Sequence, residues 1–501
     1  MLFSGSDRVG GMSEQDGRLG RLFALTGLLV GLGAGAAGYA IVDFWADEKP
    51  QAAPLAALAA VGSFAAALLL LAEKGAMLRA IAPSLAIAAV LGGVAYSALS
   101  GRMNEPHLTP WPYMFWIAVG LPLSGYLMAT LAKAALLGKT PPRYADVFFH
   151  GLTLPVISGG AGFIAALSLV LLFAWAGLLK SLDVALFHKL FQEPWFILPF
   201  VGAMGGLSIA LMRGLQSTLG GFRFLLLLLA RILMPITAVF SLTFLAVLAI
   251  KGVDPIFAAP YPSAVMLALA FVGMLIFNGV YQNGEGEPPA AWLRLATLIA
   301  LLAFPVYAGI SAYAFWLRIE DYGLTPPRII GLAMTGLAAL YSFVAFAGLL
   351  TELAWGAKRW MPLVGPLNTL MAAIWIGVLL TLGSPAIVDQ WAISARSQEA
   401  RLAQGRVPAA EFDFGYMRFS LGADGEAALD RLYALTAHPE AGAIKAGIAR
   451  ARAANNQWEY DNPSAVGAAE RETSPENAPA SDAPADDDAP PGLDDLPINP
   501  N

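Results

Sequence analysis

Long apolar runs separated by short polar segments fill most of the chain between residues 22 and 385. An α-helix needs about 20 mostly apolar residues to cross the hydrocarbon core of a membrane. The pattern therefore predicts a bundle of about eleven transmembrane helices. The predicted helices cover residues 22–42, 53–72, 79–99, 111–135, 151–179, 194–212, 230–250, 262–281, 293–316, 328–351 and 364–385.

The pattern changes after Pro385, where polar and charged residues become frequent. Three segments in this part have the apolar spacing of amphipathic helices. Phe412, Phe414 and Tyr416 alternate with other residues, as in a half-buried strand. The segments with helical spacing are residues 387–404, 424–437 and 440–454.

Beyond residue 460 the chain is rich in Asp, Glu, Pro, Ala and Ser and poor in large apolar residues. Such a segment buries too little apolar surface to offset the entropy lost on folding. We therefore expect the chain to have four parts. They are a polar N-terminal tail (1–21), a transmembrane helical bundle (22–385), a small soluble α or α+β domain (386–460) and a disordered acidic tail (461–501).

The composition supports an all-α polytopic membrane protein with the lipid bilayer as its main partner. Hydrophobic residues make up 57% of the chain and charged residues only 13%, whereas about 25% of the residues in a soluble protein are charged. The chain has no cysteine, which excludes disulfides and thiolate metal sites. Its four histidines are scattered singly, so we expect no metal site and no cofactor. Without a basic patch with interleaved aromatics, we expect no binding to nucleic acid.

The distribution of Lys and Arg predicts the orientation, because cytoplasmic loops carry an excess of these residues. With a cytoplasmic N-terminus, thirteen of them fall in inner segments and seven in outer ones. Eleven helices then place residues 386–460 outside the cytoplasm. The inner residues are Arg8, Arg18, Arg21, Lys74, Arg79, Lys133, Lys139, Arg143, Arg213, Arg223, Arg294, Lys358 and Arg359.

Small residues line one face of the first predicted helix. Gly27, Gly31 and Gly35 recur every four residues, a spacing that lets two helices approach closely in a membrane. Packing against another helix of the same bundle is the expected use of this face, with dimerisation as the alternative.

Arg231 is the charge that the pattern places nearest to the middle of a span. If its helix begins near residue 224, the side chain lies inside the membrane and faces an anionic substrate group. If the span begins at Ile232, Arg231 instead marks the cytoplasmic end of that span, with residues 214–230 along the surface. Glu73 and Glu352 fall at predicted helix ends, where we expect contact with water.

The most distinctive polar stretch is residues 316–328, which read WLRIEDYGLTPPR. Gly323 permits a tight turn, and Thr325 suits the N-cap of the next helix. We expect the two arginines of this stretch to pair with its two carboxylates. One interpretation is a rigid turn between two helices. The other is a recognition loop, with Arg318, Glu320, Asp321, Tyr322 and Arg328 as substrate-binding residues.

This stretch, entering a transmembrane helix and followed by a polar C-terminal extension, resembles the bacterial membrane family of unknown function catalogued as DUF 4153. The resemblance rests on these thirteen residues and on hydropathy over about residues 150–440. It implies a bacterial inner-membrane protein and no particular activity.

Three classes of function are compatible with the pattern. The first is transport or flipping of a small or lipidic solute, which suits many helices with internal prolines. The second is a non-enzymatic accessory protein that binds an envelope partner through its C-terminal domain. The third is a membrane enzyme acting on lipid-linked substrates, for which Glu320 and Asp321 are the only catalytic candidates.

Overall fold

The computed structural model describes residues 6–46, 52–73, 76–100, 116–138, 141–184, 186–258, 261–355 and 360–462. These residues form helices joined by short turns, with no strand among them. The predicted all-α class is therefore confirmed for the part of the chain that the structure describes. The predicted acidic tail lies outside the described residues from position 463 onward.

Eleven spans among the described residues are long and apolar enough to cross a membrane, which is the predicted number. α12 and α13 form one of these spans, with a break at Ala303. The elements up to residue 383 are α1 (Ser6–Phe44), α2 (Ala52–Leu71), α3 (Leu78–Leu99), the π-helical turn η1 (Trp116–Gly120), α5 (Leu121–Leu137), α6 (Tyr144–Ser181), α7 (Leu186–Leu190), α8 (Pro194–Gly214), α9 (Gln216–Lys251), α10 (Asp254–Phe257), α11 (Pro262–Tyr281), α12 (Ala291–Leu302), α13 (Phe304–Tyr322), α14 (Pro326–Trp355) and α15 (Val364–Gly383).

Several helices extend beyond their predicted ends. α1 begins at Ser6, so helix continues through much of the predicted N-terminal tail. α6 has 38 residues, about 57 Å at 1.5 Å per residue, which exceeds the roughly 30 Å of a hydrocarbon core. α9 begins at Gln216, so most of residues 214–230 belong to the same helix as the following span. The predicted start of the fourth span, residues 111–115, lies outside the described residues.

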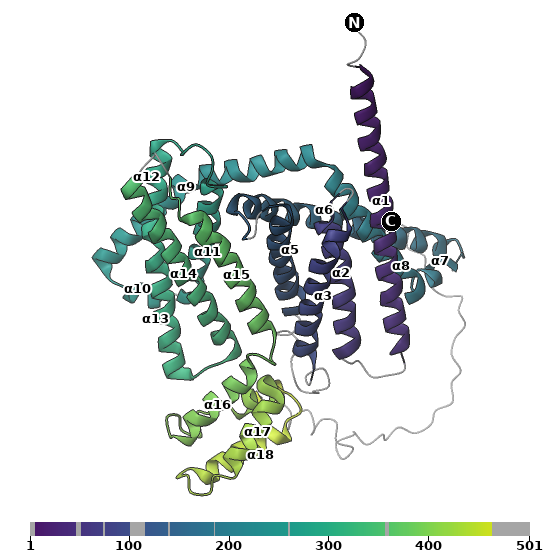
Figure 1. The fold of residues 1–501 in the computed structure, drawn as a ribbon. Coiled ribbons are helices and arrows are strands. Elements are labelled where there is room, and N and C mark those ends of the chain that lie inside the picture. The colour runs from purple at the N-terminus through teal and green to yellow at the C-terminus, as the bar shows by residue number, and fades with distance from the viewer. Residues whose placement is uncertain are drawn as a thin grey trace, which may run out of the picture.

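The spanning helices form two groups that lie side by side (Figure 1). One group contains α1, α2, α3, α5, α6 and α8, and the other contains α11 to α15 together with the second half of α9. α15 closes the seam between the groups, because Leu379 and Leu382 pack against Trp116. The two groups thus share one continuous bundle.

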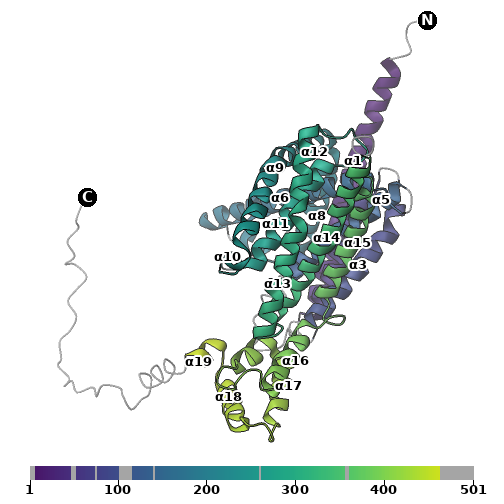
Figure 2. The same cartoon turned by 90° about the vertical axis from the view of Figure 1, so that its left-hand side faces the viewer.

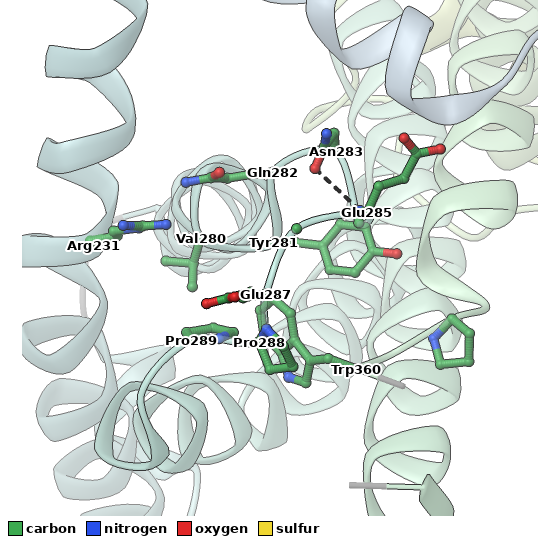
Figure 3. A pocket seen from close by; sticks show the side chains of 13 residues that line it. Arg231, Val280, Tyr281, Gln282, Asn283, Glu285, Glu287, Pro288, Pro289 and Trp360 are labelled. Atoms are coloured by element: carbon green, nitrogen blue, oxygen red, sulfur yellow. Dashed lines mark hydrogen bonds between the residues drawn. The ribbon is translucent and has the colours of Figure 1, made fainter. Parts of the chain in front are cut away.

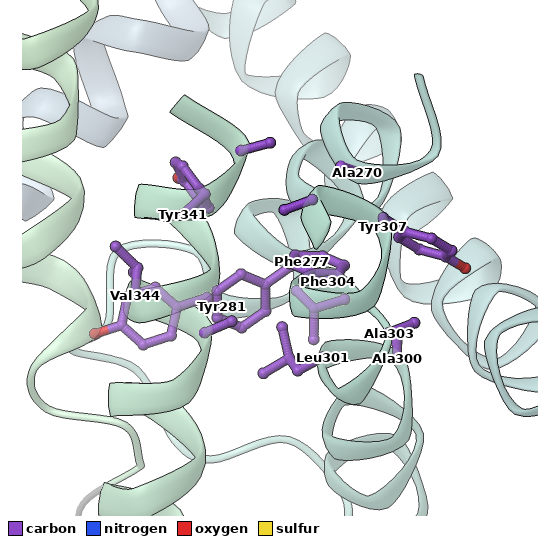
Figure 4. Packing of buried hydrophobic residues seen from close by; sticks show 14 of the residues in the cluster. Ala270, Phe277, Tyr281, Ala300, Leu301, Ala303, Phe304, Tyr307, Tyr341 and Val344 are labelled. Carbon is purple, nitrogen blue, oxygen red and sulfur yellow. The ribbon is translucent and has the colours of Figure 1, made fainter. Parts of the chain in front are cut away.

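The second group has the larger apolar core (Figure 4). Phe277 is fully buried there, and Tyr281, Phe304 and Tyr307 are at most 5% exposed. By contrast, large apolar side chains on the outside of the bundle, such as Phe163 at 69%, remain exposed. An exposed apolar surface of this extent is what a lipid environment covers.

The glycine face of α1 packs against α8 within the same chain. Gly27 lies against the backbone of Gly206, and Gly31 lies against the backbone of Gly202. Gly35 lies against Leu198 in the same way. The expected use of this face inside the bundle is therefore confirmed.

The helices after residue 389 lie below the bundle, at the end opposite to the start of α1 (Figures 1 and 2). The Asp389 carboxylate accepts hydrogen bonds from the N–H groups of Trp391 and Ala392, both at 3.0 Å, and so caps the first of them. These elements overlap the three segments with helical spacing. They are α16 (Gln390–Ala403), the π-helical turn η3 (Tyr416–Ser420), α17 (Leu421–Tyr433), α18 (Ala441–Ala453) and α19 (Gln457–Asp461).

The predicted strand at Phe412, Phe414 and Tyr416 is wrong. Phe412 lies in an irregular turn, and the chain is helical from Phe414 onward. Phe412 and Phe414 are both buried, at 6% and 1% exposure, in a core shared by α16, α17 and α18. The two residues are close in sequence because both anchor the same turn in this core. The described residues include no neighbouring strand that could form β-ladder hydrogen bonds with them.

Candidate functional site

The structure separates the residues that the sequence singled out. Arg231 lies beside the loop between α11 and α12 (Figure 3), and this loop is at the end of the bundle where α1 begins (Figure 1). Arg318, Glu320, Asp321, Tyr322 and Arg328 lie at the opposite side, at the turn between α13 and α14. The six residues therefore cannot share one substrate site.

The turn between α13 and α14 is held by its own backbone and by α16. Gly323 has a φ of +71°. Gln398 of α16 donates to the carbonyls of Tyr322 and Leu324 at 2.9 and 3.1 Å, and the Leu324 N–H donates to Ser397 at 3.0 Å. These bonds connect the bundle to the C-terminal helices, so we name this contact the α16 joint.

The expected pairing of the two arginines with Glu320 and Asp321 is wrong. Arg328 donates to the carbonyl of Gly323 at 2.6 Å and to that of Tyr322 at 3.1 Å. No ion pair within the described residues joins Arg318 or Arg328 to either carboxylate. A helix-ending turn has carbonyls without helical partners, and an arginine beside them is a strong donor.

Tyr416 of η3 lies close to the same joint. Burial raises the pKa of Tyr416 to about 12, although the nearby Arg328 guanidinium lowers it. The phenol is therefore neutral at physiological pH, and its partly buried ring packs against the core shared by α16, α17 and α18.

Arg231 lines a cavity of about 340 Å³ together with the loop between α11 and α12 (Figure 3). We call this the loop cavity. The Arg231 side chain is exposed and points from α9 toward Gln282 and Val280. Glu287 lies on the same wall, and Glu285 pairs with Arg143 at the start of α6. Arg231 lies beside this loop and within the apolar span Leu219–Lys251, so both interpretations of Arg231 stay open.

A second cavity, of about 320 Å³, lies at the same side of the bundle in the first group of helices. We call it the cationic cavity, because three cations and one carboxylate line it, an excess of two positive charges with histidine neutral. Its charged residues come from the ends of α2 and α8, the last turns of α5 and the first third of α9. The lining residues are Leu70, Glu73, Lys133, Leu137, Phe149, His150, Thr153, Leu154, Ile157, Arg213, Leu219 and Arg223.

Two of these cations hold the end of α2 in place. The Lys133 ammonium donates to the Leu71 carbonyl at 2.7 Å and pairs with Glu73. Arg213 donates to the Leu69 carbonyl, and its other terminal nitrogen lies 3.6 Å from the Glu73 carboxylate. The last carbonyls of a helix have no partner within that helix, and cations stabilise them.

Arg223 is attached more loosely. It makes one hydrogen bond, 3.3 Å long, to the Thr153 hydroxyl, and its guanidinium lies 4.2 Å from the centre of the Phe149 ring. A guanidinium has five N–H donors. Most of the donors of Arg223 therefore have no bond to the described residues and are available at the cavity.

A closed ring of polar side chains lies within the second group of helices. Asn278 donates to Tyr341 at 2.7 Å, Tyr341 donates to Asn368 at 2.8 Å, and Asn368 donates back to Asn278 at 2.8 Å. Asn368 also reaches the Tyr144 hydroxyl at 3.3 Å, which joins the ring to α6. Because these groups satisfy one another, the ring holds α6, α11, α14 and α15 together and presents no reactive group.

Glu352 does not contact water as expected. Glu352 is only 5% exposed, and its carboxylate forms an ion pair with Arg294 of α12. α14 continues to Trp355, so Glu352 lies one turn before the helix end. Its other carboxylate oxygen has no partner among the described residues.

The cationic cavity is the site that the sequence did not reveal. Lys133, Arg213 and Arg223 counted only as inner cations in the orientation argument, and Glu73 only as a helix-end carboxylate. Each of the three cations is 60 or more positions from Glu73 in the sequence, so no local motif joins them. The signal that was present is that the Lys and Arg count placed all three cations in predicted inner segments.

Eleven apolar spans and a cation-lined cavity at one end define a multi-pass helical membrane protein. Comparisons with protein-family models, with curated proteins and with solved structures find no match to this chain.

Proposed function

We propose that this protein binds an anionic solute from one side of a bacterial inner membrane and moves it into or across the bilayer. The cationic cavity supports the proposal, because its excess of two positive charges lies beside an apolar wall. An anion is attracted to such a site, and the loosely held Arg223 guanidinium offers donors to it. The internal prolines of α6, α8 and α9 suit helices that bend during transport.

The resemblance to the DUF 4153 family adds the proposed location in the bacterial inner membrane. The excess of Lys and Arg adds the proposed orientation, with the N-terminus in the cytoplasm. The cationic cavity then opens toward the cytoplasmic leaflet.

The orientation has a direct test with reporter fusions. Alkaline phosphatase fused after Gln404 is expected to be active, and phosphatase fused after Gly138 is expected to be inactive, because phosphatase folds only outside the cytoplasm. The reverse pattern would place the cationic cavity on the outer leaflet.

Transport is tested with purified protein reconstituted into vesicles that contain a fluorescent anionic lipid. The protein is expected to accelerate exchange of this lipid between leaflets. Arg223→Gln is expected to slow the exchange roughly tenfold or more, since it removes hydrogen bonds to a charged group. Arg79→Gln is the matched control, because Arg79 is an exposed cation at the start of α3, on the same side and outside the cavity lining. Exchange at the rate of protein-free vesicles would refute the proposal.

A second function, docking of an envelope partner, is favoured by the α16 joint. Gln398, Ser397 and Arg401 attach the C-terminal helices to the bundle at the α13–α14 turn. Such an attachment would transmit the binding of a partner on these helices to α13 and α14. The test is a pull-down from spheroplasts, in which residues 386–460 of the intact protein are exposed. An envelope protein is expected to be recovered with the unchanged protein and lost with Gly323→Ala. If no envelope protein behaves in this way, docking is excluded.

A further inference from the structure

The charges of the cationic cavity divide into a structural set and an available set. Lys133 is buried, and its ammonium donates to the Leu71 carbonyl and pairs with the Glu73 carboxylate. The charges of Lys133 and Glu73 therefore cancel each other. Arg213 and Arg223 together supply the remaining two positive charges. Both guanidinium groups are backed by aromatic rings, Arg213 by Phe23 at 4.7 Å and Arg223 by Phe149 at 4.2 Å. A guanidinium stacked on a ring directs its N–H edge away from the ring, toward an anion. Most Arg223 donors are unused by the described residues, whereas Arg213 has one terminal nitrogen on the Leu69 carbonyl and the other 3.6 Å from Glu73.

The wall beyond these charges is apolar and buried. Leu154, Ile157 and Leu219 line it, and each is at most 4% exposed. Leu154 and Ile157 lie about 6 and 10 Å along α6 from His150, at 1.5 Å per residue. Along α6, the lining therefore changes from polar at His150 and Thr153 to apolar at Leu154 and Ile157.

The volume of about 320 Å³ lies in the range of sites for small organic ligands. A free inorganic anion would leave the apolar wall uncovered. A membrane lipid has the matching order of groups, because its anionic phosphate lies at the level of the helix ends and its acyl chains point toward the middle of the bilayer. Guanidinium groups match phosphate oxygens with two parallel hydrogen bonds.

We propose that the cationic cavity binds a phospholipid. Arg223 holds the phosphate by hydrogen bonds, Arg213 adds its positive charge beside it, and the first carbons of one acyl chain lie against Leu154, Ile157 and Leu219. This inference rests on the proposed function only in the choice of ligand class, since lipid binding does not itself require transport.

The test uses the full-length protein in a non-ionic detergent, titrated with a short-chain phosphatidylglycerol. Saturable binding is expected. Arg223→Gln is expected to weaken it tenfold or more. Arg223→Lys is expected to restore only part of the loss, because lysine lacks the guanidinium fork. Arg79→Gln is expected to bind as the unchanged protein does. Arg223 is preferred to Arg213 for substitution, because Arg213 also caps α2.

Two further titrations, with inorganic phosphate and with an alkyl carboxylate, distinguish the sources of binding. Equal affinity for inorganic phosphate would overturn the role of the apolar wall, and equal affinity for an alkyl carboxylate of the same chain length would overturn the phosphate clamp. Unchanged lipid binding in Arg223→Gln would overturn the site itself. Lipid binding that depends on Arg223, in vesicles without accelerated lipid exchange, would refute the proposed transport and leave this inference standing.

Discussion

Gly31→Leu is expected to prevent α1 from packing on α8 and to leave little folded protein. A Cβ at Gly31 would overlap the Gly202 carbonyl oxygen and would lie 3.0 Å from the Gly206 Cα. The obstacle is backbone, so no side-chain rotation relieves it, and the two helices must separate. Overpacking a well-packed contact costs about 1–3 kcal/mol, and more when backbone must move. The measurement is the midpoint of thermal unfolding in detergent.

Gly33→Leu is the matched control for this experiment. Gly33 lies two positions away on the same helix and is exposed, and no heavy atom lies within 4 Å of a Cβ built there. Leucine is also a better helix former than glycine, so this variant is expected to melt at or slightly above the temperature of the unchanged protein. Equal unfolding midpoints for the two variants would show that α1 does not pack on α8 through its glycine face.

Gly323→Ala is expected to release α16 from the bundle while the spans remain folded. Gly323 has a φ of +71° and a ψ of −177°, a region that is almost restricted to glycine and costs other residues about 1–3 kcal/mol. The added Cβ would also lie 2.7 Å from Arg401 Cδ and 2.9 Å from Gln398 Nε2. Displacing Gln398 breaks its two bonds to the turn. Amide hydrogen exchange over α16 is expected to accelerate roughly tenfold or more, since each 1.4 kcal/mol corresponds to a factor of ten.

Gly405→Ala separates backbone strain from lost packing at the joint. Gly405 also has a positive φ, +68°, but nothing lies within 4 Å of a Cβ built there. This variant is expected to loosen the end of α16 locally and to leave the exchange at Gln398 unchanged. If Gly323→Ala left the exchange over α16 unchanged as well, the α16 joint would not be a stable contact.

Hydropathy predicted the spans well because each membrane helix satisfies its backbone hydrogen bonds within itself. An apolar run of sufficient length is therefore a local signal. The same signal placed helix ends poorly. Polar residues such as His150 and Arg223 lie within α6 and α9, since a polar side chain at the end of a span does not interrupt a helix.

Side-chain pairing was predicted less well than helices. Arg328 binds carbonyls of its own turn, and Glu352 pairs with Arg294, 58 positions away. A charged side chain selects its partner from the groups that packing brings near it, and nearness in sequence does not decide this. The alternation at Phe412 and Phe414 failed as a strand signal for the same reason, because burial in a helical core produced the same spacing.

The sequence by itself determined the class of protein, the number of spans and the helix face that carries Gly27, Gly31 and Gly35. These are properties of contiguous segments, decided by the transfer of apolar residues into lipid and by helical periodicity. Only the tertiary structure decided that α8 covers the glycine face, that α16 clamps the α13–α14 turn, and that Arg213 and Arg223 meet in one cavity. Each of these depends on which helices become neighbours, and that choice arises from packing over the whole bundle, so no short stretch of residues encodes it.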